Sequence, residues 1–407
     1  MPDTSRPPPR SLYRPEGPHL LDATMLWARE ACGGVRRAIS TKRAMLVAQG
    51  WRHTLVAPGV RGPDMVDVGG VPLPLSGGYR CVWNRAQATR LIEKAEPEII
   101  ESSDPFTLAW AALDAARALQ VPSVAFCHSN LPALAAHWAG NRCATAWPGR
   151  WAERQAQRYL ARVYAGFDMV LAPSRAMTDT LHDLGVRHAQ HQPLGVDCAV
   201  FNPAAADPAW RRALERRLQL PPGTRLLVYI GRFAAEKHLD LLSRAVELLG
   251  PKHVLLAVGS GPRPPKGRQV IVLKPQFHSG RLARLLASCD AFVHAGDQET
   301  FGLAALEAMA CGTPLVASAA AGLGELADGV AITMTSRRPG DWAEAMRAAL
   351  AGRDGDLAGR ALARAREHDW KRVLDGLSQR YLHLLQRGPL DTDEPSATPT
   401  QPLLLQA

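Results

Sequence analysis

The sequence predicts an α/β protein made of two doubly wound domains, each a parallel sheet covered by helices. Two observations lead to this prediction. Short apolar runs typical of buried strands alternate with helical segments along most of the 407 residues, and such alternation is typical of parallel sheets. The alternation breaks once, around residues 188–208, where Pro193 and Pro203 bound an irregular stretch, and then resumes. The break therefore indicates a boundary between two domains.

The first domain is predicted to span residues 19–200. Its first strand, residues 19–27, leads through Gly33-Gly34 into a helix that Gly50 ends, because glycine accepts the left-handed conformation that often follows a helix. A strand, a glycine turn, a helix and a second strand begin a parallel α/β unit. The other strands are expected at residues 53–57, 98–101, 123–127 and 168–172, and the helices at residues 106–119, 131–139, 150–164 and from Ser174 to about Gly185.

The second domain, residues 201–368, is predicted to repeat the same layout. Strands are expected at residues 226–230, 254–258, 270–273, 291–294 and 315–317, with a helix at residues 239–249. Residues 369–387 form an expected amphipathic C-terminal helix that packs back toward the first domain. The Pro-rich residues 1–18 and the polar residues 388–407 are expected to be disordered.

Charge and cysteine content restrict the classes of function. The chain carries 48 Lys and Arg against 38 Asp and Glu, a net charge of +10, which favours anionic partners such as nucleotide phosphates or acidic lipid headgroups. Seven scattered cysteines without a C-x-x-C pair argue against a disulfide framework or a structural zinc site and fit a reducing cytosol. No signal peptide and no transmembrane run is expected.

A stretch with two carboxylates, Glu299 and Glu307, is the most informative motif. Between them Thr-Phe-Gly opens a helix that should end near Cys311, before Gly312 and Pro314. The free N–H groups and positive dipole end of such a helix suit a phosphate. An acid and base pair of a glycoside hydrolase is disfavoured, because eight helical steps span about 12 Å, whereas such pairs lie roughly 5–9.5 Å apart. The spacing favours two separate binding roles.

Further candidates follow the predicted strands. Arg232 and Lys237 come after the first strand of the second domain, where a guanidinium fork and an ammonium group could hold a diphosphate. Gly33 and Gly34 would let backbone approach a phosphate closely. His128 follows a strand of the first domain. Each signal is weak alone, since surface cations are usually solvated, glycine pairs make tight turns, and a single histidine commonly satisfies local hydrogen bonds.

In order along residues 20–386, these motifs resemble glycosyltransferase family 4. They are Gly33-Gly34, His128, Ala172-Pro-Ser-Arg175, Pro193-Leu-Gly-Val-Asp197, Gly231-Arg232 with Glu236-Lys237, Gly259-Ser-Gly-Pro262, and Glu299 with Glu307. The resemblance implies retaining enzymes of the GT-B fold, in which two Rossmann-like domains face each other across a cleft. This sequence departs from the family pattern at Ala235 and His238, which flank Glu236-Lys237, and at His294-Ala295, where the family often has Pro-Ser.

The resemblance also implies roles for these residues. Arg232 and Lys237 would hold the donor diphosphate, Glu299 would contact sugar hydroxyls and Glu307 would bind the ribose. The backbone N–H groups of Phe301, Gly302 and Leu303 would meet the phosphate or sugar. Gly33 and Gly34 would lie by the phosphates, and His128 near the transferred sugar. Charge that develops on a departing diphosphate needs fixed cations and helix N–H groups, which agrees with this assignment.

No metal requirement is expected. Two Asp-x-Asp matches, Asp354-Gly-Asp356 and Asp391-Thr-Asp393, lie between helices and in the tail, and are interpreted as solvated acids. Walker, H-E-x-x-H and G-x-S-x-G motifs do not occur in the sequence.

A basic helical face is the last feature of interest. Arg150, Arg154, Arg158 and Arg162 recur at every fourth position, with Trp147 and Trp151 nearby. Together with Arg36, Arg37, Lys42 and Arg43, this face could form a basic surface that docks on an anionic membrane, although charge runs are usually solvated. Nucleic-acid binding is disfavoured because aromatic residues are not interleaved with the basic ones.

The sequence therefore predicts a retaining glycosyltransferase that moves a hexose, mannose or glucose, from a nucleotide-diphosphate sugar to a lipid or glycan acceptor. It is expected in the cytoplasm, with peripheral contact to the inner face of the cell membrane as an open question. Two alternatives remain: a nucleotide-sugar epimerase of the same fold, and a non-catalytic membrane-associated scaffold.

Overall fold

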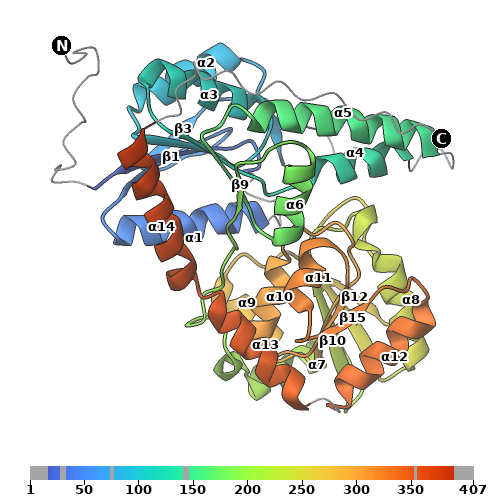
Figure 1. Cartoon of the computed structure of the whole chain (residues 1–407). Coiled ribbons are helices and arrows are strands. Elements are labelled where there is room, and N and C mark those ends of the chain that lie inside the picture. The colour runs from blue at the N-terminus through green and yellow to red at the C-terminus, as the bar shows by residue number, and fades with distance from the viewer. Residues whose placement is uncertain (1–16, 28–33, 74–77, 141–145, 353–354, 389–407) are drawn as a thin grey trace, which may run out of the picture.

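The computed structural model describes residues 17–27, 34–73, 78–140, 146–352 and 355–388. Gly33, Asp354, residues 1–16 and residues 389–407, all of which carry predictions made above, lie outside these ranges. The chain forms two α/β domains, one above the other in Figure 1. Each domain contains one large parallel sheet, which confirms the predicted fold class.

The first domain is built on a seven-stranded sheet with the order β3-β2-β1-β6-β7-β8-β9, in which all neighbours are parallel. β1 ends four residues earlier than predicted, because Thr24 and Met25 both donate hydrogen bonds to the carboxylate of Asp104. The short strands β3 and β9 escaped prediction since neither has an apolar run. The strands are β1 (His19–Ala23), β2 (Arg52–Ala57), β3 (Met65–Asp67), β6 (Ile99–Ser102), β7 (Ser123–Phe126), β8 (Met169–Ala172) and β9 (Ala189–His191).

Helices of the first domain follow the predicted alternation, with one addition. Ser174 caps α6 as its sequence position predicts, since its hydroxyl accepts a hydrogen bond from the N–H of Met177 at 3.2 Å. The unpredicted α2 is capped in the same way by Asn84. The helices are α1 (Gly34–Ala48), α2 (Arg85–Lys94), α3 (Thr107–Leu119), α4 (Leu131–Gly140), α5 (Ala146–Tyr164) and α6 (Arg175–Asp183), and a small hairpin pairs β4 (Val71–Pro72) with β5 (Arg80–Cys81).

The second domain has a six-stranded parallel sheet with the order β12-β11-β10-β13-β14-β15. In order of appearance within the domain this is 3-2-1-4-5-6, the arrangement of dinucleotide-binding sheets, which bind ligands beyond the carboxyl ends of the strands. The strands are β10 (Arg225–Ile230), β11 (His253–Val258), β12 (Val270–Leu273), β13 (Ala291–His294), β14 (Leu315–Ser318) and β15 (Ile332–Met334). The helices are α7 (Pro208–Arg217), α8 (Leu239–Leu249), α9 (Ser279–Ala287), α10 (Leu303–Ala310), α11 (Ala321–Ala327), α12 (Pro339–Leu350) and α13 (Gly355–Glu367).

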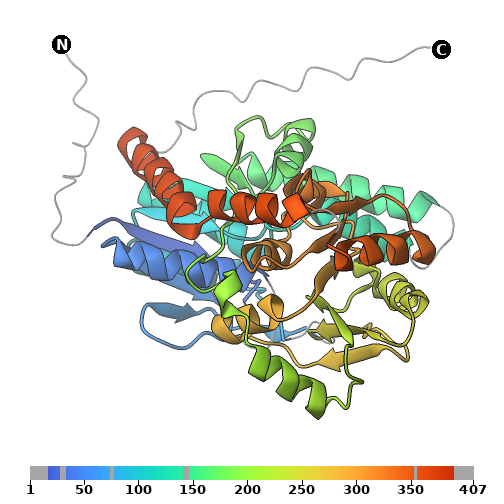
Figure 2. The same ribbon diagram turned by 90° about the horizontal axis from the view of Figure 1, so that it is seen from below.

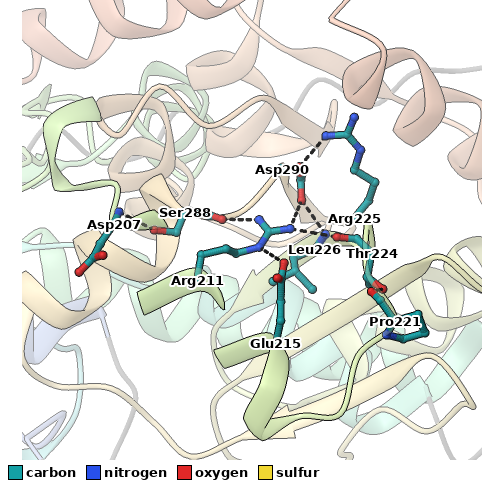
Figure 3. Close-up of polar contacts among 9 residues, drawn as sticks. All are labelled: Asp207, Arg211, Glu215, Pro221, Thr224, Arg225, Leu226, Ser288 and Asp290. Carbon is teal, nitrogen blue, oxygen red and sulfur yellow. Dashed lines mark hydrogen bonds and ion pairs between the residues drawn. The ribbon is translucent and has the colours of Figure 1, made fainter. Parts of the chain in front are cut away.

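Helix α7, which follows the segment between the domains, is bonded to the amino-terminal ends of two central strands of the second sheet, away from the cleft. Arg211 donates to the carboxylate of Asp290 at 2.9 Å and to the carbonyl of Thr224 at 3.0 Å (Figure 3). Asp290 also accepts from the N–H of Leu226 and the guanidinium of Arg225, at the amino-terminal ends of β10 and β13. These bonds hold α7 at the amino-terminal ends of β10 and β13, opposite the carboxyl ends of the strands.

The last helix, α14 (Trp370–Arg387), leaves the second domain and lies against the first (Figure 1 and Figure 2). Its Tyr381 is fully buried and donates a hydrogen bond to Glu101 at the end of β6. Its Ser378 donates to Gln49 at 3.0 Å, just after α1. The chain thus crosses between the domains twice, at residues 192–207 and again before α14. Across the described ranges, the structure has no helix with the length and apolar character that a membrane span requires.

Candidate active site

A cavity of about 1290 Å³ lies between the two domains. Its walls come from the segments that follow β1, β6 and β7 in the first domain and β10, β11, β12 and β13 in the second. The carboxyl ends of both sheets therefore face one common cleft. Of the predicted site residues, the cavity is lined by Gly34, His128, Arg232, Lys237, Glu299, Gly302 and Leu303.

The buried carboxylate of Glu236 holds Arg232 at the carboxyl end of the second sheet. Arg232 follows β10, and its guanidinium pairs at 2.5 Å with Glu236, which is 3% exposed. The Arg232 side chain itself remains 45% exposed. The i, i+4 spacing of Arg232 and Glu236 was visible in the sequence, but only the structure shows that the carboxylate orients the guanidinium toward the cleft.

The carboxylate of Glu299 contacts two nitrogen groups, one from Lys237 and one from His294. Lys237, at the end of a short 3-10 turn (Ala235–Lys237), forms an ion pair with Glu299 Oε1. His294, the last residue of β13, places Nε2 3.1 Å from the same oxygen. Although burial favours the neutral acid, the charge of Lys237 and the hydrogen bond from His294 hold the pKa of Glu299 well below its usual range. Glu299 is therefore a fixed, ionised acceptor on the cavity wall.

Glu307 lies behind the cavity wall, in the middle of α10. Its side chain is only 2% exposed and pairs with Arg37 of α1, so this contact joins the two domains. Arg37 lines the cavity, whereas Glu307 does not. Burial raises the pKa of Glu307, and Arg37 offsets this only in part. The second oxygen, Oε2, is buried with no hydrogen-bond partner among the described residues.

The turn between the two glutamates has the predicted form. Gly302 precedes α10 with a φ of 98°, a left-handed conformation that favours glycine, and a Cβ there would lie 2.8 Å from Leu323. The side chain of Phe301 is buried and lies beside His368, with ring centroids 5.7 Å apart, so it does not line the cavity. Gly302 and Leu303 do line it, at the start of the helix.

Gly322 supports this turn and was not singled out from the sequence. Its N–H donates to the carbonyl of Glu299 at 3.0 Å. A Cβ at Gly322 would overlap the carbonyl of Thr300. The absence of a side chain here thus lets α11 approach the turn.

His128 and Gly34 complete the first-domain wall. The His128 ring stacks on Phe126 with centroids 4.3 Å apart, and its carbonyl accepts from Thr300 of the second domain at 2.9 Å. Burial, aided by the charge of Lys42, lowers the pKa of His128 to about 3, so its ring is neutral at physiological pH. Gly34 is the first residue of α1 and faces Leu303 across the cleft.

The basic surface expected from Arg36, Arg37, Lys42 and Arg43 does not form as predicted, because Arg36 and Arg37 line the cleft and Lys42 is buried. Arg36 lies between the rings of Trp27 and Phe277, with its guanidinium carbon 5.5 Å and 5.8 Å from their centroids. Phe277 belongs to the second domain and is 52% exposed. The contact with Phe277 therefore adds a further link between α1 and the opposite domain.

The helix that was expected to carry the four arginines forms as α5. α5 presents Arg150, Arg154, Arg158 and Arg162 as exposed side chains, and Trp151 is 57% exposed. It packs beside α4 at the far end of the first domain (Figure 1). Within the described ranges no three His, Cys, Asp or Glu side chains are grouped in a way that could hold a metal ion.

Comparison with known families gives two matches. The profile described as "Glycosyltransferase Family 4" matches residues 32–200, and the one described as "Glycosyl transferases group 1" matches residues 224–352. The first match covers the first domain from the start of α1, and the second covers the second sheet with its helices as far as α12.

Curated relatives align over most of the chain. A GDP-mannose-dependent alpha-(1-6)-phosphatidylinositol dimannoside mannosyltransferase of Mycobacterium tuberculosis is 30% identical over 362 residues, which are 84% of this chain and 90% of the relative. A GDP-mannose-dependent alpha-mannosyltransferase of Corynebacterium glutamicum is 27% identical over 391 residues, 89% of each.

Solved structures share the fold at lower identity. Sucrose-phosphate synthase from Thermosynechococcus elongatus superposes with a TM-score of 0.71 at 20% identity, covering 91% of this chain and 100% of the other. HepE from Anabaena, in complex with UDP-glucose, superposes with a TM-score of 0.69 at 15% identity, covering 90% and 100%.

Proposed function

This chain belongs to glycosyltransferase family 4, and from that premise we propose that it transfers mannose from GDP-mannose to a hydroxyl group of a lipid or glycan acceptor, with retention of configuration. The predicted family and the predicted class of enzyme, a nucleotide-sugar-dependent hexosyltransferase, are confirmed by the matches above. The choice of GDP-mannose follows the relatives, whose names specify that donor. Because those relatives transfer sugars, transfer is favoured over epimerisation.

The observation that best supports the proposal is the ordered set of charged groups on one wall of the cavity. Arg232 and Lys237 supply two cations, and Glu299 lies against Lys237 as an ionised acceptor. A nucleotide sugar carries a diphosphate next to a ring of hydroxyls. The cations match the diphosphate, and the carboxylate matches the hydroxyls of the sugar.

In the proposed reaction, the cations stabilise negative charge that develops on the departing diphosphate. The bond between the sugar and the phosphate oxygen breaks, the acceptor oxygen attacks the same face of the sugar, and the leaving phosphate takes the acceptor proton. Once Arg37 moves aside, the buried Oε2 of Glu307 would accept a hydrogen bond from a ribose hydroxyl, and the N–H groups at the start of α10 would meet phosphate or sugar. The neutral ring of His128 would contact the transferred sugar from the opposite wall.

We propose that no metal ion takes part. The charges of Arg232 and Lys237 on the cavity wall would balance the diphosphate charge without a metal. Transfer should therefore proceed at an unchanged rate after dialysis against EDTA, and a rate that falls tenfold and returns with Mg²⁺ or Mn²⁺ would contradict this part of the proposal.

A lipid acceptor is favoured over a soluble glycan by the first-domain side of the cavity. That side carries apolar side chains, namely Leu26, Met45, Leu73, Phe106, Leu131 and Leu134. The exposed arginines of α5 would then hold the enzyme at an anionic membrane surface, where each contributes about 1 kcal/mol. We place the protein in the cytoplasm, at the inner face of the cell membrane, in keeping with its cysteines: the five in the described ranges are free thiols.

Sedimentation with lipid vesicles tests the proposed contact of α5 with a membrane. The protein should sediment with vesicles of phosphatidylglycerol and phosphatidylcholine but not with phosphatidylcholine alone, and reversal of Arg150 and Arg154 to Glu should abolish sedimentation. Equal sedimentation of the parent and the reversed variant with anionic vesicles would exclude α5 as the docking face.

Nucleotide binding and turnover test the donor. GDP should raise the thermal midpoint more than UDP or ADP, since a ligand at 100-fold over its dissociation constant stabilises by about 2.7 kcal/mol. The enzyme should consume GDP-mannose when given a membrane lipid extract, and Glu299→Ala should lose most of this turnover. Selective stabilisation by UDP or ADP would overturn the choice of donor, and full turnover by Glu299→Ala would overturn the assignment of the site.

A further inference from the structure

We propose that His294 is a positioning residue for donor-sugar recognition: it fixes the orientation of Glu299, so that one carboxylate oxygen is held by protein and the other is presented to the sugar. This inference rests on the proposed function of the cleft. It assigns a role to one of the positions at which the sequence departs from the family pattern, a histidine at the end of β13 where proline is common.

The hydrogen-bond partners of the ring define its tautomer. The backbone N–H of Gly296 donates to His294 Nδ1 at 3.1 Å, so Nδ1 must be the acceptor and the ring proton of neutral histidine must reside on Nε2. Nε2 lies 3.1 Å from Oε1 of Glu299. With this tautomer, the ring donates from Nε2 to the carboxylate of Glu299.

The ring is confined, so its direction is well defined. His294 is 3% exposed, and the Tyr229 and Phe292 rings lie 5.4 Å and 6.4 Å from it. On its remaining side, a Cβ added to Gly296 would lie 2.7 Å from the imidazole Cε1. A confined ring with both nitrogens engaged loses little entropy when it holds its neighbour.

Lys237 alone would not specify the same geometry. Its ammonium group is a point charge on a flexible stem and can accept either carboxylate oxygen. Both Lys237 and His294 contact Oε1, while Oε2 has no bonding partner among the described residues. Glu299 retains 24% of its side-chain exposure on the cavity wall, so Oε2 is the oxygen available to sugar hydroxyls.

Three substitutions separate the two contacts of the ring. His294→Gln carries an amide N–H near the position of Nε2 and can still donate to Glu299. His294→Asn carries an amide oxygen near the position of Nδ1 and can still accept from Gly296, but does not reach Glu299. His294→Leu removes both contacts. His19→Gln is the matched control, because His19 is another buried histidine with one side-chain partner, Thr54 at 2.8 Å, at the amino-terminal end of the central strand β1, away from the cleft.

The measurements are the dissociation constants of GDP and GDP-mannose by calorimetry, the steady-state kcat and KM for GDP-mannose, and the thermal midpoint of each variant. We expect His294→Leu and His294→Asn to bind GDP as the parent does, but to lose about tenfold or more in kcat/KM for GDP-mannose, as a lost bond to a charged group predicts. His294→Gln should recover most of that loss. His19→Gln should change only the midpoint.

Four results would overturn the proposal. The first is parental kcat/KM in His294→Asn together with a loss in His294→Gln, which would make His294 an anchor for the Gly296 loop only. The second is an equal loss of GDP and GDP-mannose affinity in all three variants, which would indicate general damage. If the parent itself binds no guanosine nucleotide, the proposed donor is wrong and this inference fails with it. If the parent turns over GDP-mannose and His294→Leu matches it, only the role of His294 is wrong.

Discussion

The guanidinium of Arg37, in the first domain, pairs with the carboxylate of Glu307, in the second, although the two residues are 270 positions apart. Arg37 lines the cavity and Glu307 lies behind it, so this ion pair separates Glu307 from the cavity. A ribose that binds Glu307 must therefore share or replace Arg37. Under the proposed function, Arg37 and the ribose would compete for one carboxylate, which leads to the first prediction.

Replacement of Arg37 by Met should destabilise the protein without nucleotide and enlarge the stabilisation by GDP. The buried carboxylate of Glu307 would lose its partner, at a cost of about 1–3 kcal/mol. Ribose hydroxyls would then supply hydrogen bonds that the carboxylate lacks. Thermal midpoints with and without saturating GDP measure both effects. Arg43→Met on the same helix is the control, because Arg43 bonds to the carbonyl of Pro63. Equal GDP shifts in the parent and Arg37→Met would show that Arg37 does not compete with nucleotide.

Replacement of Lys237 by Met should slow transfer far more than it weakens nucleotide binding. Loss of one fixed charge at a developing negative charge commonly costs about 100- to 1000-fold in kcat. Glu299 would also lose one of its two partners. Release of GDP from GDP-mannose with acceptor measures kcat. Lys252→Met, at an exposed position before β11, should behave as the parent. A kcat for Lys237→Met within threefold of the parent would remove Lys237 from the proposed mechanism.

Replacement of Tyr381 by Phe should weaken the attachment of α14 to the first domain. Tyr381 is fully buried, and its hydroxyl donates to Glu101. Loss of this bond leaves a buried acceptor less satisfied, which costs about 1–3 kcal/mol. Urea unfolding followed by tryptophan fluorescence measures the change in the free energy of unfolding.

Tyr159→Phe provides the comparison for that measurement. Tyr159 is 37% exposed and donates to the carbonyl of Pro105 at 2.7 Å, so its hydroxyl can be replaced by water. A loss of stability in Tyr159→Phe as large as in Tyr381→Phe would contradict the importance of the buried bond.

The buried charges beneath α14 predict a dependence of stability on pH. Lys42 contacts Asp22 at 2.8 Å and Glu101 at 2.5 Å, so two carboxylates share one ammonium group. Burial and the charge of Asp22 raise the pKa of Glu101 to about 7 despite Lys42, whereas in the unfolded chain it returns to about 4.5. Between these values the native protein holds a proton that the unfolded chain has lost. The contribution of Glu101 to stability is therefore complete at low pH and is lost as the pH rises toward 7.

Glu101→Gln tests this dependence because an amide does not titrate. Unfolding free energies of the parent and the variant, measured from pH 5 to pH 8, should converge or cross. The difference between the two should change by at most about 1.4 kcal/mol per pH unit, the limit for one proton. Asp22 does not interfere, because its pKa is lowered and its contribution is lost only in more acidic solution. A constant difference across this range would mean that Glu101 is ionised in the native protein throughout.

Local signals in the sequence were enough for most of the fold. Apolar runs predicted β1, β6, β7 and β8 of the first sheet, and the turn residues Ser174 and Gly312 predicted a helix start and a helix end that the structure contains. β3 and β9 were missed because three-residue strands at a sheet edge bury too little apolar surface to leave a periodic pattern. α2 was missed because charged residues break its apolar face.

The sequence by itself identified three charged residues that line the cavity. Arg232, Lys237 and Glu299 were identified as candidates from their residue types and their places after strands, and the structure brings all three to one cavity. Such placement is predictable because parallel strands all end at the same edge of a sheet.

Only the tertiary structure decided how these groups are held and how the domains meet. The contact of His294 with Glu299 depends on the path of one loop after β13, and the contacts of Arg37 with Glu307 and of Tyr381 with Glu101 join residues hundreds of positions apart. Local propensity and periodicity report which elements form and which face each buries. They carry no information on which side chains meet when two complete domains and a returning helix pack together, because those contacts arise from the packing of whole surfaces.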